Sequence, residues 1–355
     1  MKATTPSRQL QIGDRLIGEG HPAYLVAEIG TNHNGDLDLA RKTIDAAKAA
    51  GADAVKFQNY HTDDFIADRT LTYTYDGKDG PVTENLYEMF KRVELGQEQL
   101  ARISEHCAVT GIDWHSTPTS MSGVKTLTDL GVSVLKNGSD YLGDLDLIEG
   151  MGNTGLPVVL SSGMATMADI DDAVRCFRRT GNDQLILLQC TSQYPTPADE
   201  ANIRRVRSLA DAFGCLSGFS DHTAGIAASV AAVTLGAVWI EKHFTLDRSL
   251  PGPDHAFSSD PDEFAELAAA LRFTEVALGQ SAIVLSEREV GARTQHRLSC
   301  SAARNLAPGH RLAQADIRYV RPGSGIPPRD AHLILGRRLA KEVPAGRHIL
   351  LDDLD

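Results

Sequence analysis

The stretch AEIGTNHNGDLDLARKTIDAAKAAGADAVKFQ, residues 27–58, decides the fold of this chain. It begins inside an apolar run that predicts a strand over residues 24–29. An amphipathic helix is expected over 37–50, and a second short strand over 54–57. Gly51 stands between the helix and this second strand, a position where glycine commonly ends a helix. The stretch therefore predicts strand, helix and strand in succession, the unit from which parallel sheets are built.

The same alternation continues along the chain. Six further strands are predicted at residues 112–115, 133–135, 157–160, 185–188, 216–219 and 237–240, with helices between them and a last helix at 261–278. Eight strands alternating with helices predict a (β/α)8 TIM barrel. A doubly wound open sheet is the alternative, but it gathers its site at one switch point, whereas here polar clusters follow many strands.

The domain plan has a catalytic barrel over residues 1–280, a linker over 281–299 and a small β-rich domain over 300–355. A hairpin over 10–21 is expected to cover the base of the barrel. The insertion at 62–92 is too long for an ordinary loop, and we expect it at the rim of the active site, as a lid. Residues 296–355 carry ten Lys or Arg and six Asp or Glu, a net charge of +4 that contrasts with the acidic remainder.

Composition excludes several classes of partner and location. The 355 residues carry a net charge of −12, which argues against nucleic acid or an anionic membrane as the main partner. No apolar run is long enough to span a bilayer, and residues 1–10 lack the apolar stretch of a signal peptide. The five cysteines are scattered, without a CxxC pair, so we expect reduced thiols and a cytoplasmic protein.

Polar side chains follow the predicted strands, and in a barrel such positions converge on one mouth. Alternation places Lys56 with Gln58, Ser220 with His222, and Glu241 with His243 on shared faces. Lysines ringed by serines predict a pocket for a phosphorylated or carboxylated substrate. The alternative is that each lysine simply reaches solvent.

His222 and His243 end neighbouring strands and could bind one divalent ion, with open positions for substrate oxygens. Two hydrogen-bonded histidines without metal are an equal alternative from spacing alone. If an ion binds, two nitrogen ligands favour Mn²⁺ or Mg²⁺ over a closed zinc site. For His33 and His115 we expect structural roles.

Taken together, the motifs resemble those of the bacterial sialic acid (N-acetylneuraminate) synthases. After residues 27–58 come HSTP (115–118), LSSGMAT (160–166), QCTSQYPTP (189–197), GFSDHTAG (218–225) and EKHFTLDRSLPGPDH (241–255), in the family's order. The tail around Arg321 resembles the family's antifreeze-like (SAF) domain. The resemblance covers residues 20–350, and the combination is far more specific than any one motif.

The resemblance implies a carbon–carbon bond-forming transferase that condenses phosphoenolpyruvate with an open-chain N-acyl aldose such as N-acetylmannosamine. It implies a divalent metal, Mn²⁺ before Mg²⁺ or Co²⁺, and a domain-swapped homodimer in which Arg321 reaches the partner's sugar site. The matching residues fall into three groups: catalytic or metal-binding Glu28, His222 and His243; phosphoenolpyruvate-binding Lys56, Lys136, Ser139, Ser161 and Ser220; sugar-binding Gln58, Tyr141, Tyr194, Asp254 and Arg321.

Two departures from the family pattern fall on the sugar side. Tyr141 stands where the family has an acidic sugar contact, with Asp140 shifted by one position, and Ser192 replaces an asparagine. The identity of the sugar is therefore open, and legionaminic, pseudaminic or another nonulosonic acid is an alternative product.

Three rival functions come from other classes. A metal-dependent barrel hydrolase would need a third strong metal ligand. A glycosidase could use Glu28 and Glu241 as its two catalytic carboxylates. The antifreeze-like tail suggests a non-catalytic carbohydrate-binding protein. Phosphate release from phosphoenolpyruvate that needs both metal and aldose separates these alternatives from the synthase.

Overall fold

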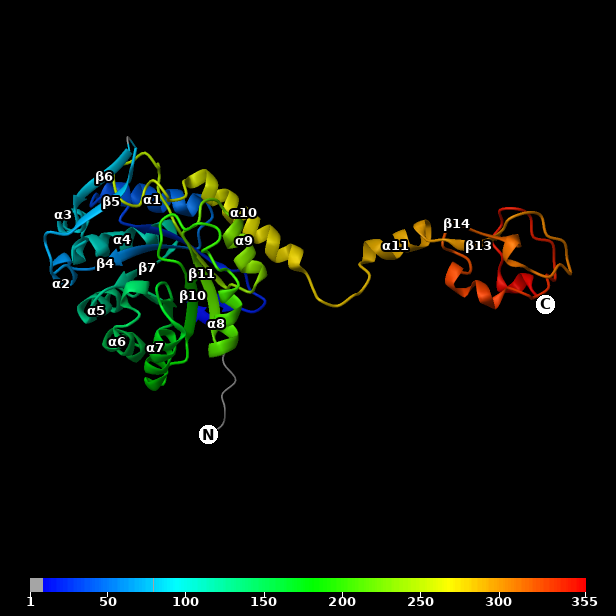
Figure 1. Cartoon of the computed structure of the whole chain (residues 1–355), viewed down its shortest axis with the longest axis horizontal. Helices are drawn as coiled ribbons and strands as arrows, with labels where there is room; N and C mark the ends of the chain where they lie inside the picture. Colours follow the sequence, from blue (N-terminus) through cyan, green and yellow to red (C-terminus); the bar gives the residue numbers. More distant parts are fainter. Residues whose placement is uncertain (1–8, 79) are drawn as a thin grey trace. The chain divides into compact units, whose positions relative to one another are not determined.

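The computed structural model describes residues 9–78 and 80–355, which form two compact units that divide between Gly279 and Gln280. The first unit is a nearly closed barrel of eight parallel strands surrounded by helices (Figure 1). Hydrogen-bonded ladders run round it from β7 through β4, β3, β12, β11, β10 and β9 to β8, and β7 and β8 lie beside each other. The strands are β3 (Tyr24–Gly30), β4 (Ala54–Asn59), β7 (Asp113–Pro118), β8 (Leu135–Asn137), β9 (Val158–Ser161), β10 (Leu185–Cys190), β11 (Leu216–Asp221) and β12 (Trp239–His243).

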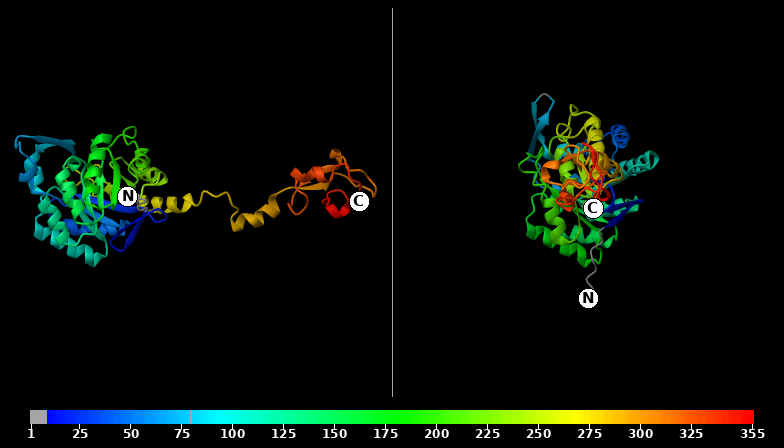
Figure 2. Two further views of the ribbon diagram at one scale, coloured as in Figure 1. Left: turned by 90° about the horizontal axis from the view of Figure 1, so that it is seen from below. Right: turned by 90° about the vertical axis from the view of Figure 1, so that its right-hand side faces the viewer.

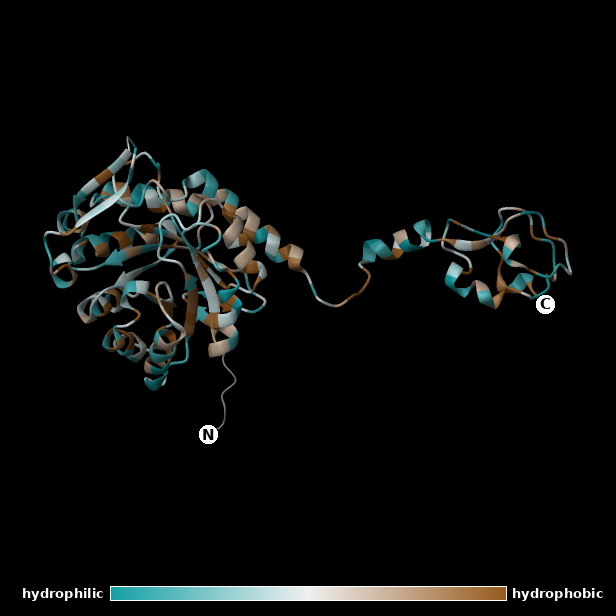
Figure 3. Ribbon diagram, viewed as in Figure 1, coloured by the Kyte–Doolittle hydropathy of each residue, from teal (hydrophilic) through white to brown (hydrophobic). Residues whose placement is uncertain are grey.

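In the barrel, the last strand β12 pairs with the first strand β3, and β7 lies beside β8, so the strands form one ring. This arrangement confirms the barrel and excludes the open sheet. Helices cover the outside and bury their apolar faces against the strands, so brown and teal alternate along them (Figure 3). Asp36 begins the first of these helices by accepting hydrogen bonds from the backbone N–H groups of Asp38 and Leu39. The helices are α1 (Leu37–Ala49), α4 (Gln97–Thr110), α5 (Met121–Asp129), α6 (Leu145–Asn153), α7 (Met167–Arg179), α8 (Arg205–Phe213), α9 (Ala227–Thr234) and α10 (Pro261–Leu278).

The base of the barrel is filled with apolar side chains. The predicted hairpin is present as β1 (Gln9–Ile12) and β2 (Arg15–Gly18). Its Ile12 and Ile17 belong to one buried cluster with Trp239 and other residues from the barrel interior. Because the interior is packed at this end, polar strand-end residues have open space only at the carboxyl ends of the strands.

The insertion after β4 contains α2 (Thr62–Phe65), β5 (Thr72–Gly77), β6 (Gly80–Asn85) and α3 (Leu86–Arg92). The strands β5 and β6 form an antiparallel hairpin that projects from the barrel (Figures 1 and 2).

The second unit has an antiparallel pair, β13 (Ser299–Ala302) and β14 (Ile317–Val320), around a small apolar core. Three 3₁₀ helices accompany it: η2 (Gln314–Asp316), η3 (Pro328–Leu333) and η4 (Leu351–Asp353). The segment expected to be a linker holds a helix, α11 (Glu287–His296), which begins at a capping box of Ser286 and Glu289. This helix has no buried residue, so it carries no apolar stripe from which it could have been predicted.

None of the helices in the described ranges has the length and apolar character that crossing a bilayer requires. The expectation about the N-terminal residues falls mainly on positions 1–8, which lie outside the described residues.

Candidate active site

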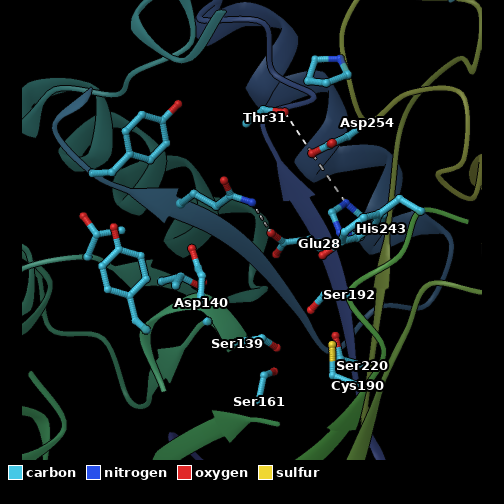
Figure 4. Close-up of a pocket in the computed structure, with 18 of the residues that line it drawn as sticks. Glu28, Thr31, Ser139, Asp140, Ser161, Cys190, Ser192, Ser220, His243 and Asp254 are labelled. Atoms are coloured by element: carbon cyan, nitrogen blue, oxygen red, sulfur yellow. Dashed lines mark hydrogen bonds and ion pairs between the residues drawn. The ribbon is translucent and has the colours of Figure 1, made fainter. Parts of the chain in front are cut away.

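A pocket of about 380 Å³ opens at the carboxyl ends of the barrel strands. Figure 4 shows its side chains converging from strands on all sides. Of the thirteen site residues predicted from the sequence, every one but Arg321 lines this pocket: Glu28, Lys56, Gln58, Lys136, Ser139, Tyr141, Ser161, Tyr194, Ser220, His222, His243 and Asp254.

Two buried lysines lie at the floor of the pocket, on either side of Glu241. The Oε1 atom of Glu241 is 3.7 Å from Nζ of Lys56 and 3.8 Å from Nζ of Lys136. Lys136 donates a hydrogen bond to Oγ of Ser161 at 2.6 Å, and Ser220 donates to Glu241 at 3.3 Å. The alternative that the lysines reach solvent is wrong, because both side chains are buried.

Glu28 forms an ion pair with Lys56 at 2.8 Å and accepts a hydrogen bond from Gln58. Burial raises the pKa of Glu28 to about 7, although Lys56 opposes the shift. Burial would also raise the pKa of Glu241, but Lys136 and Lys56 outweigh it and lower the pKa to about 2. The two carboxyls therefore differ: Glu241 is a fixed counter-charge, and Glu28 can exchange a proton near neutral pH.

Two glycines leave the space that these side chains occupy. Gly30 has φ +52°, and a Cβ there would lie 3.1 Å from Oε1 of Glu28. A Cβ on Gly163 would meet Oγ of Ser192 at 2.3 Å and Oγ of Ser139 at 2.6 Å. The backbone N–H of Gly163 instead donates to Ser139 at 3.0 Å, which holds this hydroxyl at the pocket.

His222 and His243 lie side by side, with ring centroids 5.4 Å apart. Nδ1 of His222 is 2.8 Å from the carbonyl oxygen of Thr191, which fixes the tautomer and leaves Nε2 as the ring's lone-pair nitrogen. Nδ1 of His243 is buried, has no hydrogen-bond partner among the described residues and lies 3.8 Å from Asp254 (Figure 4). Asp254 also accepts a hydrogen bond from Thr31.

This histidine pair suits a divalent ion. Burial holds the pKa of His243 well below its ordinary value, so the ring is neutral and its lone pair is available. Within residues 9–78 and 80–355, no three His, Cys, Asp or Glu side chains are grouped so that they could hold an ion together. An ion at the pair would therefore need oxygens from water or substrate.

A buried ion pair supports the two histidines from the outer face of the strands. Asp221 and Lys242 are register partners on β11 and β12, each next to one histidine in the sequence. Lys242 lies 3.2 Å from Asp221 and donates to the carbonyl oxygen of Thr223 at 2.7 Å. Such pairs are costly to break, so this one holds the strand register that keeps His222 beside His243.

The remaining sequence candidates lie elsewhere. Arg321 is an exposed residue of the second unit, where its Nε donates to the carbonyl oxygen of His296. His115 is fully buried against Trp239, and Nδ1 of His33 accepts a hydrogen bond from the backbone of Gly35. Neither histidine lines the pocket.

Sequence reasoning missed several pocket residues. Alternation grouped Glu241 with His243, but it gave no sign that Glu241 bridges the two lysines. Cys190 also lines the pocket; burial alone would raise the pKa of its thiol, but His222 lowers it to about 7. The insertion supplies an aromatic and aliphatic wall, for which no periodic signal existed.

Known proteins share these features. A model of the NeuB family matches residues 43–282, and a model of the SAF domain matches residues 301–355. The N,N'-diacetyllegionaminic acid synthase of Legionella pneumophila is 36% identical over 342 residues, covering 95% of this chain and 96% of that protein. The pseudaminic acid synthase of Helicobacter pylori is 34% identical over 343 residues, covering 94% of this chain and 98% of that protein.

A solved structure supports the same family assignment. The N-acetylneuraminic acid synthetase from Leptospira borgpetersenii, in complex with citrate, aligns with a TM-score of 0.73 at 31% identity, over 81% of this chain and 95% of that one. Relatives named as acid synthases thus match nearly the whole chain, and the family resemblance drawn from the motifs is confirmed. The chain is an enzyme that belongs to the NeuB family and carries a C-terminal SAF domain.

Proposed function

We propose that this enzyme condenses phosphoenolpyruvate with an open-chain N-acyl aldose, N-acetylmannosamine or a relative, to give a nonulosonic (sialic-type) acid and phosphate. The observation that carries the proposal is the buried Lys56 and Lys136, ringed by serines, in one pocket with the histidine pair. Because relatives are named as legionaminic and pseudaminic acid synthases, those products are alternatives within the same chemistry.

The lysine end of the pocket suits phosphoenolpyruvate, whose phosphate and carboxylate carry up to three negative charges. Lys136, Ser161, Ser139 and Ser220 offer a cation and hydroxyl donors that can replace water around such an anion. Lys56 supplies the second cation. Glu241 balances the lysines while the anion is absent.

The histidine end suits a divalent ion, Mn²⁺ before Mg²⁺ or Co²⁺, held by His222 and His243. Such an ion acts as a Lewis acid that polarises the carbonyl of the aldose. Tyr194 packs on both histidines, with its ring centroid 4.2 Å from that of His222 and 5.7 Å from that of His243. Gln58, Tyr141 and Asp254 line the same pocket and offer donors and acceptors for the amide and hydroxyls of the sugar.

In the reaction, C3 of phosphoenolpyruvate bonds to the aldehyde carbon of the sugar while the aldehyde oxygen takes a proton. Water then adds at C2, and the tetrahedral centre loses phosphate by C–O cleavage. Glu28, with a pKa raised to about 7 by burial, is the residue suited to moving these protons.

The test measures phosphate release from phosphoenolpyruvate by the purified full chain with Mn²⁺, N-acetylmannosamine and its acylated, deoxygenated relatives. Release should require both metal and aldose, and mass spectrometry should find a product heavier than the aldose by a pyruvate unit. No release with any N-acyl aldose would contradict the proposal, and release without aldose would instead indicate a phosphatase.

The proposal includes a homodimer in which the second unit of one chain serves the partner's barrel through Arg321. The net charge of +4 on residues 296–355, against the acidic remainder of the chain, supports an electrostatic contact between subunits. The planar guanidinium of Arg321 suits an acyl carbonyl. The alternative is that Arg321 is a surface residue without a catalytic role.

A cytoplasmic location of the protein stays a prediction.

Mixing two inactive variants tests this arrangement. His222→Ala and Arg321→Ala chains, unfolded and refolded together, are expected to form heterodimers that regain activity. In such heterodimers one site combines an intact barrel with an intact Arg321 from the other chain. Each variant refolded alone is the control. Mass-verified heterodimers that remain inactive, or an Arg321→Ala enzyme with full activity, would contradict the proposal.

A further inference from the structure

Asp254 reaches the pocket from a long loop that joins β12 to α10. Residues 244–260, all of them described, make up this loop, so regular secondary structure does not fix the position of the carboxylate. The carboxylate still has a defined place, 3.0 Å from Oγ1 of Thr31 and 3.8 Å from Nδ1 of His243 (Figure 4). Contacts elsewhere in the loop hold it there.

The loop after the first barrel strand, β3, binds the loop after the last one, β12. Five polar residues make these contacts, and we call them the loop latch: Asn32 and Asn34 from the first loop, and Thr245, His255 and Ser258 from the last. Asn34 is half-buried and the other four are buried. Because β3 and β12 are paired, the latch joins two neighbouring loops at the mouth of the barrel.

A chain of hydrogen bonds runs through the latch to Asp254. Nδ2 of Asn32 donates to the carbonyl oxygen of Phe244 and to Oγ of Ser258, both at 2.9 Å. The hydroxyl of Ser258 donates in turn to the backbone carbonyl oxygen of Asp254 at 2.6 Å. Successive hydrogen bonds of this kind polarise and strengthen one another. Asn32 therefore holds the backbone of Asp254 through Ser258.

The residue after Asp254, His255, gives the loop a second fixed point. Its Nδ1 lies 2.7 Å from Oγ1 of Thr245, and its Nε2 lies 3.4 Å from Oδ1 of Asn34. Burial lowers the pKa of His255 to about 4, so the ring is neutral. Gly252 leaves room for this contact, since a Cβ there would lie 2.8 Å from the ring and 2.9 Å from Oδ1 of Asn34. The backbone around Asp254 is thus held at two points.

We infer that Asn32 and Ser258 are positioning residues that set the Asp254 carboxylate for the acceptor sugar. Neither of these two described residues lines the pocket, so they act through Asp254 and not by touching a substrate. A latch that served stability alone could end on any backbone group of the loop. This one ends on the carbonyl of a pocket residue whose carboxylate Thr31 also holds. The inference rests on the proposed condensation and adds the groups that orient its acceptor.

The test compares Asn32→Asp and Ser258→Ala with the unaltered full chain. Asp matches Asn in size but, when ionised, has no hydrogen to donate to Phe244 or Ser258. Ser258→Ala removes a single hydroxyl and decides the matter if Asn32→Asp does not fold. Both variants are expected to lower kcat/KM for the N-acyl aldose, by up to about 100-fold if the carboxylate moves by about 1 Å. KM for phosphoenolpyruvate, which binds at the lysines, should stay unchanged; a general loss of structure would change both.

Asn182→Asp is the matched control, because Nδ2 of Asn182 also bridges two backbone segments. It donates to the carbonyl oxygens of Leu156 at 2.8 Å and Gly152 at 3.3 Å. This bridge lies between α7 and β10, at the amino ends of the strands and opposite the pocket. The control should keep both KM values. An unchanged kcat/KM for the aldose in Asn32→Asp and Ser258→Ala, or an equal loss in Asn182→Asp, would overturn the inference.

Crystal structures of the same variants separate this inference from the condensation itself. The Asp254 carboxylate should shift in Asn32→Asp and Ser258→Ala and stay in place in Asn182→Asp. A carboxylate that stays in place in all three variants would overturn the inference even with the condensation established. An unaltered enzyme that releases no phosphate with any N-acyl aldose would overturn the condensation, and the shift of Asp254 would still decide whether the latch positions it.

Discussion

Replacing Lys136 by Met is expected to raise KM for phosphoenolpyruvate by about 10- to 100-fold, because a hydrogen bond to a charged group contributes about 1.5–3 kcal/mol. Lys136 is buried at the centre of the barrel, where it donates to Ser161 and to the carbonyl oxygen of Asn137. Burial lowers the pKa of this ammonium, so a bound phosphate or carboxylate would stabilise its charged form. Met keeps the length of the side chain and removes the charge.

The measurement is KM for phosphoenolpyruvate at saturating acceptor, together with direct binding by calorimetry. Lys125→Met is the matched control, since Lys125 is an exposed lysine of α5 that pairs with Asp129 on its own helix. Thermal unfolding shows whether each variant folds. If Lys136→Met and Lys56→Met both bind phosphoenolpyruvate as tightly as the control, the anion site has been assigned to the wrong residues.

Most of the barrel could be predicted because its elements are long and regular. Helices α4, α7 and α10 have the predicted bounds, since each carries a continuous apolar face. The prediction was shifted at β8, expected over 133–135 and found at Leu135–Asn137. The apolar signal stops at Leu135, but the strand continues because Lys136 faces the pocket and Asn137 is buried. In the sequence pattern, a polar residue that faces the pocket therefore cannot be distinguished from the end of a strand.

The residues of the site could be predicted from the sequence, but their positions relative to one another could not. Strand ends converge in any barrel, so Lys56, Lys136, His222 and His243 could be placed at one mouth from the sequence. The position of Glu241 between the lysines depends on the register of three strands, which no local pattern specifies. The helices that the insertion contributes to the pocket were not predictable either, because α2 and α3 are too short to show helical periodicity.

Loss of either histidine of the pair is expected to reduce turnover by more than about 100-fold, since even the outer partners of metal ligands typically contribute 10- to 100-fold. The reason lies in their geometry. His222 is oriented by Thr191, and the buried Nδ1 of His243 has no hydrogen-bond partner among the described residues. The Asp221–Lys242 ion pair holds the two strands in register. The two rings lie side by side at the pocket, with centroids 5.4 Å apart.

Activity alone would not separate a metal ligand from a residue that contacts substrate, so the decisive readout is metal binding. Titration with Mn²⁺, followed by the decrease in the electron paramagnetic resonance signal of free Mn²⁺, should show one site per chain that is lost in His222→Ala and in His243→Ala. His106→Ala is the control, because His106 pairs with Asp45 on the outside of the barrel. Chelation should abolish turnover, and Mn²⁺ should restore it. Full activity in a metal-free sample, or unchanged Mn²⁺ binding in both variants, would show that the two imidazoles serve the site only through hydrogen bonds.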